Sequence, residues 1–169
     1  MEFVEFETLA LADWVRLVRR DANPFGAAIA GIQVRKMDRF VGARDVDGRM
    51  VAVIGAAIAQ VTVNDHAPFE VVGVGSLLVR KDVRANGVAR ELMAHLRKIT
   101  AEMGPDRAML FCEPHLLPVY SRRDYTQLTD AVWVDQPAGP MIMPLHAMWR
   151  PIRPTNWPAG TIRIHGLPF

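Results

Sequence analysis

The stretch Val71–Met103, VVGVGSLLVRKDVRANGVARELMAHLRKITAEM, decides the fold of this chain. Its first nine residues, 71–79, are rich in β-branched side chains and end at a basic pair, a pattern that predicts a buried strand leaving the core. From Val88 onward the apolar residues recur at the spacing of one helical face, and Gly104 ends the pattern. The stretch therefore predicts a strand, a basic loop and a long helix in direct succession.

The six residues between this strand and this helix, Arg84 to Ala89, are suited to hold a phosphate. A helix start offers unpaired backbone NH groups with a partial positive charge, and Gly87 lets an anion approach the backbone closely. Basic side chains add positive charge around the same point: Arg80, Lys81, Arg84 and Arg90. The alternative is an ordinary connection between a strand and a helix with a solvated basic edge.

This order of strand, basic loop, glycine and helix resembles the coenzyme A loop of the GCN5-related N-acetyltransferases. The family pattern Arg/Gln-x-x-Gly-x-Gly/Ala corresponds here to Arg84-Ala85-Asn86-Gly87-Val88-Ala89. The resemblance implies that this loop, together with Arg90, binds the diphosphate of acetyl-CoA as cosubstrate. It also implies that backbone groups of Leu77, Leu78 and Val79 pair with the pantetheine arm as though it were an extra strand.

The rest of the chain supplies further elements in the order that the same fold requires. Strands are expected where apolar or alternating residues end at turn signals: 3–8, 39–44, 50–63, 107–112, 132–134 and 141–145. Helices are expected at 9–20 and 116–123, with a less clear short helix at 25–36. The resemblance implies an α/β (α+β) GNAT fold, with a mixed, mostly antiparallel sheet of about seven strands. The sheet would contain a splayed parallel pair and be flanked by about four helices.

Tyr120 is the candidate proton donor for the reaction. Acetyl transfer from a thioester to an amine needs an uncharged amine, stabilisation of the oxyanion and a proton for the departing thiolate. The segment Leu117–Tyr125 resembles the family's second signature, in which a tyrosine precedes a glycine and an aromatic residue. Asp124 replaces the usual glycine, and aspartate tolerates a left-handed helix end better than most residues. The alternative is a tyrosine that only packs its helix onto the sheet. For the oxyanion, the resemblance implies a backbone NH of Leu77 or Leu78.

The general base has no clear mark in the sequence. The chain looks most like the aminoglycoside N-acetyltransferases, through its loop, its tyrosine segment and its C-terminal arm, and several of these place a glutamate on the strand before the loop. Residues 72–76 contain no acid here, and Glu70 lies toward the far end of that strand. Glu113, directly after the next strand, is the preferred catalytic base, with His115 and Asp65 behind it. Glu113 could instead interact with a helix dipole, and the amine could lose its proton through water.

Length and composition limit the other possibilities. A chain of 169 residues, half of it apolar, suits one domain with a sizeable core, and the formal charge of +2 is too small to argue for nucleic acid. One cysteine, Cys112, excludes an internal disulfide framework and fits a reducing compartment. The histidines show no metal-ligand spacing, so no metal is expected. No signal peptide or membrane span is recognised, so the cytoplasm is the expected location.

The chain is expected to divide into an acetyltransferase domain, 1–150, and an extended C-terminal arm, 151–169. Prolines in the arm argue against regular structure there, and the arm would pack on its own domain or on a partner subunit. The expected reaction is acetyl transfer from acetyl-CoA to a primary amine of a small cationic molecule, such as an aminosugar antibiotic or a metabolite, by direct attack. The alternatives are a protein lysine or N-terminal acetyltransferase and a non-catalytic relative that binds acyl-CoA. The resemblance also admits a homodimer.

Overall fold

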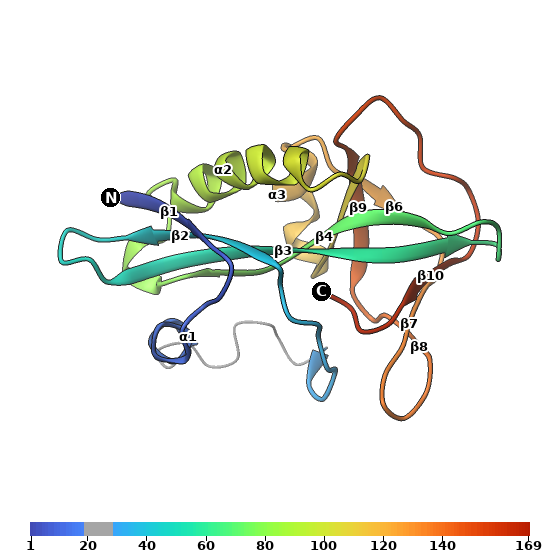
Figure 1. Ribbon diagram of the computed structural model, residues 1–169, viewed down its shortest axis with the longest axis horizontal. Helices are drawn as coiled ribbons and strands as arrows, with labels where there is room; N and C mark the ends of the chain where they lie inside the picture. Colours follow the sequence, from blue (N-terminus) through green and yellow to red (C-terminus); the bar gives the residue numbers. More distant parts are fainter. Residues whose placement is uncertain (19–28) are drawn as a thin grey trace.

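The computed structural model describes residues 1–18 and 29–169, and these residues form one mixed sheet with helices on both faces (Figure 1). The strands are β1 (Glu2–Phe6), β2 (Arg39–Arg44), β3 (Met50–Val63), β4 (Phe69–Val79), β5 (Arg107–Cys112), β6 (Thr126–Leu128), β7 (Val132–Val134), β8 (Met141–Ile142), β9 (His146–Pro151) and β10 (Ile162–His165). The helices are α1 (Leu11–Val18), α2 (Val88–Glu102) and α3 (Leu117–Ser121), with short 3₁₀ turns η2 (Lys81–Val83) and η3 (Pro114–Leu116).

The sheet separates two hydrophobic clusters. Its strands run in the order β6-β9-β5-β4-β3-β10-β7-β8, and β2 and β1 branch from β3. On one face, α2 and α3 pack against side chains such as Ile54 and Val72. On the other face, α1 packs with Leu17 against Val53 and Val71. Figure 1 shows α1 and α2 on opposite sides of the sheet, so the strands between them are buried on both faces.

The predicted hairpin between β2 and β3 is confirmed, and its turn shows why. Gly48 has φ of +72°, a left-handed conformation that glycine adopts without a steric penalty. The Asp45 carboxylate accepts the backbone NH groups of Asp47 at 3.1 Å and Arg49 at 2.9 Å. These hydrogen bonds hold the pKa of Asp45 below its ordinary value, with smaller contributions from nearby arginines.

The parallel pair β4 and β5 is also confirmed, and the two strands part before β4 ends. Pairing extends only from Val72–Ala108 to Val74–Leu110, whereas β4 continues to Val79. Toward β3, two residues of β4, Ser76 and Leu77, lie opposite one residue, and Ser76 has φ of +55°. This bulge bends β4 at the point where it leaves β5. From Gly75 to Val79, one backbone edge of β4 has no strand beside it in the described part of the chain.

The predicted fold class is confirmed, although the sheet has ten strands within residues 1–18 and 29–169 rather than about seven. Three strands were not predicted, namely β6, β9 and β10, and two of them have fewer than five residues, too short for a period-two pattern to stand out. Within the less clear region 25–36, residues 25–28 lie outside the described residues, and 32–36 have no regular structure. None of the helices in residues 1–18 and 29–169 is long and apolar enough to cross a bilayer.

The C-terminal segment contains a strand that its prolines did not suggest. Strand β10 lies between β3, to which it is antiparallel, and β7, to which it is parallel. The stretch from Thr161 to His165 carries no proline, and its alternating residues Ile162 and Ile164 are fully buried. The prolines on either side therefore limit the length of β10 without preventing it. The division into a domain at 1–150 and an arm at 151–169 stays a prediction.

Candidate functional site

The loop that leads into α2 contains two left-handed residues. Ala85 has φ of +64°, and Gly87, the residue that caps the N-terminus of α2, has φ of +78°. The loop is tied back to β4, because the Arg84 side chain donates a hydrogen bond of 2.9 Å from Nε to the Val79 carbonyl oxygen. This hydrogen bond places the loop that contains Ala85 and Gly87 at the end of β4.

The backbone NH groups of this loop are available to an anion. Within residues 1–18 and 29–169, no backbone oxygen accepts a hydrogen bond from the amides of residues 85–90. The next amide along the chain, that of Glu91, donates to the Gly87 carbonyl oxygen at 3.1 Å. A Cβ atom at Gly87 would meet only the Arg90 guanidinium, at 3.5 Å. An α-helix of 15 residues begins here, so its partial positive charge adds to these donors. The residues fit a diphosphate.

Not every predicted cation is equally available at this loop. The Arg80 guanidinium binds Asp82 at 2.6 Å and Asp45 at 3.5 Å, and the hydrogen bond that it donates to the Asp82 carboxylate raises the pKa of Arg80. The Arg90 side chain is 73% exposed and contacts Glu91 at 3.1 Å. Arg90 can therefore swing toward a ligand at little cost, while Arg80 mainly anchors the loop to the β2–β3 turn.

The direction of the β4 backbone distinguishes the residues that could line the open edge. The Arg80 amide donates to the Val51 carbonyl oxygen of β3 at 2.8 Å. Because backbone groups alternate in direction along a regular strand, those of Leu78 point toward β3 and those of Val79 point away from it. Leu77 belongs to the bulge, where this alternation is interrupted, so the alternation counts only against Leu78 as the donor to an oxyanion. The Val79 carbonyl is shared with Arg84.

Tyr120 lies on the same face of the sheet as α2. Its side chain is 8% exposed, and its ring meets the Tyr125 ring edge to face at 6.0 Å. Burial, with smaller effects of Cys112 and Tyr125, raises the pKa of Tyr120 to about 12. The hydroxyl therefore stays protonated at neutral pH and can donate a hydrogen bond.

Asp124, in the position of the family's glycine, has φ of +65°. Its carboxylate accepts a hydrogen bond of 2.7 Å from Arg97 of α2, and Arg97 also donates to the Arg123 carbonyl oxygen at 2.6 Å. These contacts connect α2, which begins at the loop, with the segment that carries Tyr120. The predicted left-handed turn is confirmed.

The acidic candidate Glu113 follows β5 in an extended conformation, with φ of −71° and ψ of 156°. Its side chain is one third exposed and lies 3.3 Å from His115 Nδ1. Cys112, the residue before it, is buried, and burial raises the pKa of its thiol to about 11. Cys112 is therefore an uncharged thiol at neutral pH and a poor nucleophile.

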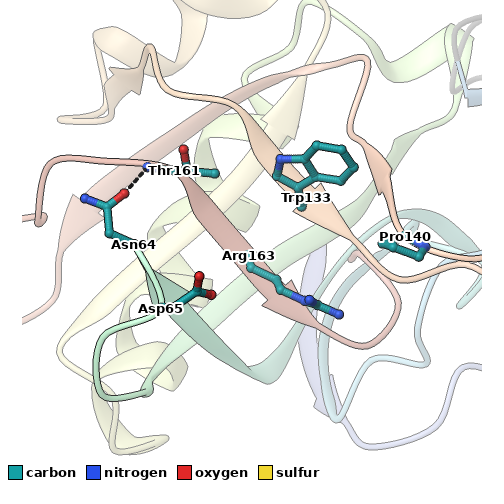
Figure 2. Close-up of a pocket in the computed structure, with 6 residues that line it drawn as sticks. All are labelled: Asn64, Asp65, Trp133, Pro140, Thr161 and Arg163. Carbon is teal, nitrogen blue, oxygen red and sulfur yellow. Dashed lines mark hydrogen bonds between the residues drawn. The ribbon is translucent and has the colours of Figure 1, made fainter.

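Two further acids that the sequence offered lie at the other end of β4. Asp65 lines a pocket with Asn64, Trp133, Pro140, Thr161 and Arg163, and Figure 2 shows its carboxylate there beside the Asn64–Thr161 hydrogen bond. Glu70 pairs with Gln60 near the same end. Eight residues of strand separate Phe69 from Leu77, a distance of roughly 26 Å at 3.3 Å per residue. Neither Asp65 nor Glu70 can reach a reaction at Leu77.

The aromatic residue Phe169 was not among the predicted site residues, and it lies beside β4 and β5. Its ring covers Gly73 of β4 and stacks on Phe111 of β5 with the ring centres 5.2 Å apart. The signal in the sequence was the pair of glycines at 73 and 75 within a strand of bulky residues, because glycine in a strand often marks a close approach by another group. That pattern does not say which residue makes the approach.

Comparison with known families gives one match, to an acetyltransferase (GNAT) domain over residues 26–128. No protein of curated function matches the sequence.

Comparison with solved structures gives many matches to one fold. The GNAT family N-acetyltransferase YhbS from Escherichia coli, in complex with CoA, has a TM-score of 0.66 and 18% identity, over 96% of this chain and 89% of that chain. The ribosomal-protein-S18-alanine N-acetyltransferase from Escherichia coli has a TM-score of 0.59 and 16% identity, over 94% of this chain and 99% of that chain. The N-acetylglutamate synthase from Neisseria gonorrhoeae, complexed with CoA and N-acetyl-glutamate, has a TM-score of 0.58 and 12% identity, over 90% of this chain and 36% of that chain.

Proposed function

The chain belongs to the GNAT acetyltransferase domain family, and on this premise we propose that it moves an acetyl group from acetyl-CoA to a primary amine. The observation that carries the proposal is the loop at residues 84–90. Its amides are available to an anion, its two left-handed residues shape it, and α2 begins at its end. Two of the similar solved structures were determined with CoA bound, which supports the same cosubstrate here.

We assign the catalytic roles to two groups. The Leu77 amide, on the part of β4 that has an open edge, is the group that we assign to the thioester oxygen as it gains negative charge. The Tyr120 hydroxyl donates a hydrogen bond to the departing sulfur. Its pKa of about 12 is higher than that of an ordinary thiol, about 8.5, so Tyr120 stabilises the thiolate mainly as a hydrogen-bond donor. A proton that it does transfer must be replaced from solvent.

Glu113 is the group that we assign to the amine. Two positions after Phe111 in an extended chain, it falls on the same face of the sheet as that residue, opposite α2. Its carboxylate, with His115 beside it, can attract a cationic amine and accept a proton directly or through water. Glu113→Gln is expected to lower turnover more at pH 7 than at pH 9, because a larger share of the amine is already uncharged at the higher pH.

A small cationic amine, such as an aminosugar, is the acceptor class that we favour. The resemblance of the loop, the tyrosine segment and the C-terminal region to aminoglycoside N-acetyltransferases supports it. A protein N-terminus or lysine is the alternative. Thiol release from acetyl-CoA, measured across aminosugars, polyamines and short peptides, separates the two classes. Turnover with peptides alone would contradict the small-molecule assignment.

Titration calorimetry with CoA tests the loop directly. Gly87→Glu places a side chain and a negative charge where the phosphates bind, so binding is expected to fall below detection. Gly104→Glu is the matched control, because Gly104 also has a positive φ, +108°, with open space around it, at the other end of α2. Equal affinity of the wild type and Gly87→Glu would overturn the cosubstrate assignment. Binding of CoA without thiol release from acetyl-CoA for any amine would favour a non-catalytic acyl-CoA binder.

A further inference from the structure

The space over the glycines of β4 is filled by the C-terminal segment. A Cβ atom on Gly73 would overlap the Phe169 ring. A Cβ atom on Gly75 would lie 2.8 Å from the Phe169 carbonyl carbon and 2.8 Å from Cε of Met37. The Phe169 ring is 7% exposed and also stacks on Phe111 of β5, so it bridges the two strands where their pairing stops.

Arg35 holds this segment in place. Its backbone NH donates to the Pro168 carbonyl oxygen at 2.7 Å, and its Nε donates to the Leu167 carbonyl oxygen at 2.8 Å. The other end of the same guanidinium binds the Ile58 carbonyl oxygen of β3 at 2.7 Å. Two hydrogen bonds from Arg35 therefore hold the main chain beside Phe169, and the third ties Arg35 to β3, which leaves the ring little freedom to move away from Gly73.

Neither face of the sheet is open to a chain that follows the open edge of β4 as far as Gly75. From Val72 to Val74, β5 occupies the edge of β4 that is open from Gly75 to Val79. A bound chain that runs along this open edge from Val79 toward Gly75 must therefore leave the plane of the sheet before it reaches Val74. On the α2 face, the cluster of buried residues with Cys112 and Tyr120 fills the space. On the opposite face, the rings of Phe169 and Phe111 close it.

On the basis of the proposed acetyl-CoA function, we propose that Phe169 determines which acyl-CoA molecules the protein accepts, by limiting the length of the acyl chain. Its ring forms the end wall of the acyl site and limits the length of the acyl chain that the site accepts. Phe169 is thus a specificity-determining residue, and Arg35 is a positioning residue that acts through it. Nothing in this role requires Phe169 to touch the amine.

Calorimetry with CoA, acetyl-CoA, butyryl-CoA and hexanoyl-CoA tests this wall without knowledge of the acceptor. The wild type is expected to bind CoA and acetyl-CoA well and the longer acyl-CoAs progressively more weakly. Phe169→Ala is expected to bind butyryl-CoA about tenfold more tightly than the wild type does, the gain for burying two methylene groups, with unchanged affinity for CoA. Phe69→Ala is the matched control, because Phe69 packs on the same cluster at the opposite end of β4.

The outcomes separate this proposal from the function on which it rests. Suppose that all variants bind CoA. If Phe169→Ala then keeps the wild-type preference among acyl chains, or if Phe69→Ala changes that preference equally, the role proposed for Phe169 is wrong and the proposed acetyl-CoA function stands. If the wild type does not bind CoA, both fail. Phe169→Leu covers the case in which the alanine variant does not fold, and it is expected to change the preference in the same direction by a smaller factor. Arg35→Met should shift the preference similarly, since it releases the segment.

Discussion

At the scale of single residues, Tyr120 shows how burial selects a chemical role. A tyrosine exposed to water would have a pKa near 10, whereas this one is raised to about 12 because its anion would be poorly solvated. A group that holds its proton so firmly donates a hydrogen bond at any pH at which the protein works. The donor role that we propose for Tyr120 therefore depends on the burial of its side chain as well as on the presence of a tyrosine.

Tyr120→Phe is expected to lower kcat about 100-fold or more, because the departing sulfur loses its hydrogen-bond donor. The affinity for CoA should change less than twofold, since the ring and its packing remain. Steady-state kinetics and calorimetry measure the two effects. Tyr125→Phe, the adjacent buried tyrosine, is the control and should keep turnover. A parallel loss of CoA affinity in Tyr120→Phe would show that the hydroxyl has a structural role.

At the scale of elements, β4 and the turn after α3 place the site. Strand β4 combines two glycines, a bulge at Ser76 and an unpaired edge, and each departs from a regular strand at the point where the chemistry is proposed. The turn after α3 depends on a left-handed residue, Asp124, that bonds Arg97 of α2. The positions of the loop and of Tyr120 are thus connected through α2.

Substitutions at Asp124 are expected to separate backbone conformation from the ion pair. Asp124→Gly should leave the free energy of unfolding within about 0.5 kcal/mol of the wild type, since glycine accepts φ of +65° and the exposed pair contributes little. Asp124→Ala should lower it by about 1–2 kcal/mol, the cost of a left-handed alanine. Urea unfolding measures both. Arg97→Gln removes the ion pair and the hydrogen bond to the Arg123 carbonyl oxygen but leaves residue 124 unchanged, and a loss as large as that of Asp124→Ala would contradict this ranking.

At the scale of the whole molecule, the C-terminal segment is part of the central sheet. Strand β10 closes the sheet between β3 and β7, and Phe169 then reaches back across β4 to β5. In Figure 1 the chain ends beside the middle of the sheet, next to β3 and β4. The last residues therefore contribute both to stability and to the shape of the proposed acyl site.

Ile164→Ala is expected to lower the free energy of unfolding by about 2–5 kcal/mol, because removal of its fully buried side chain would leave a cavity in the hydrophobic cluster on the α1 face of the sheet. Arg163→Ala, one residue earlier and exposed, should cost less than about 1 kcal/mol. Urea unfolding of both variants measures the difference. Equal and small losses would show that β10 is not an integral part of the sheet.

Stability is expected to fall above pH 9. The folded state holds the protons of Cys112 and Tyr120 to about pH 11 and 12, whereas the unfolded state releases them near pH 9 and 10. Between its unfolded and folded pKa values, each group binds fewer protons in the unfolded state. The free energy of unfolding therefore falls there by up to about 1.4 kcal/mol per pH unit for each group, whereas below pH 9 both groups contribute their full stabilisation. Cys112→Ala should reduce the slope between pH 9 and 11 in urea unfolding. An unchanged slope would contradict the assignment to Cys112.

The sequence by itself determined the elements that depend on near neighbours. The hairpin at Asp45–Arg49, the long helix that begins at Val88, the strand at 107–112 and the loop between Arg84 and Ala89 could all be predicted, because turn chemistry and apolar periodicity act over a few residues. The resemblance carried by the same loop predicted the family, which the match over residues 26–128 confirms.

Only the tertiary structure decided how distant segments meet. It showed that β4 and β5 part after Val74 and that Asp65 lies at the opposite end of β4 from the loop. It also brought Phe169 and Arg35, 134 residues apart, to the same place on β4. No local pattern encodes such contacts, because they arise from the register of strands that pair across most of the chain.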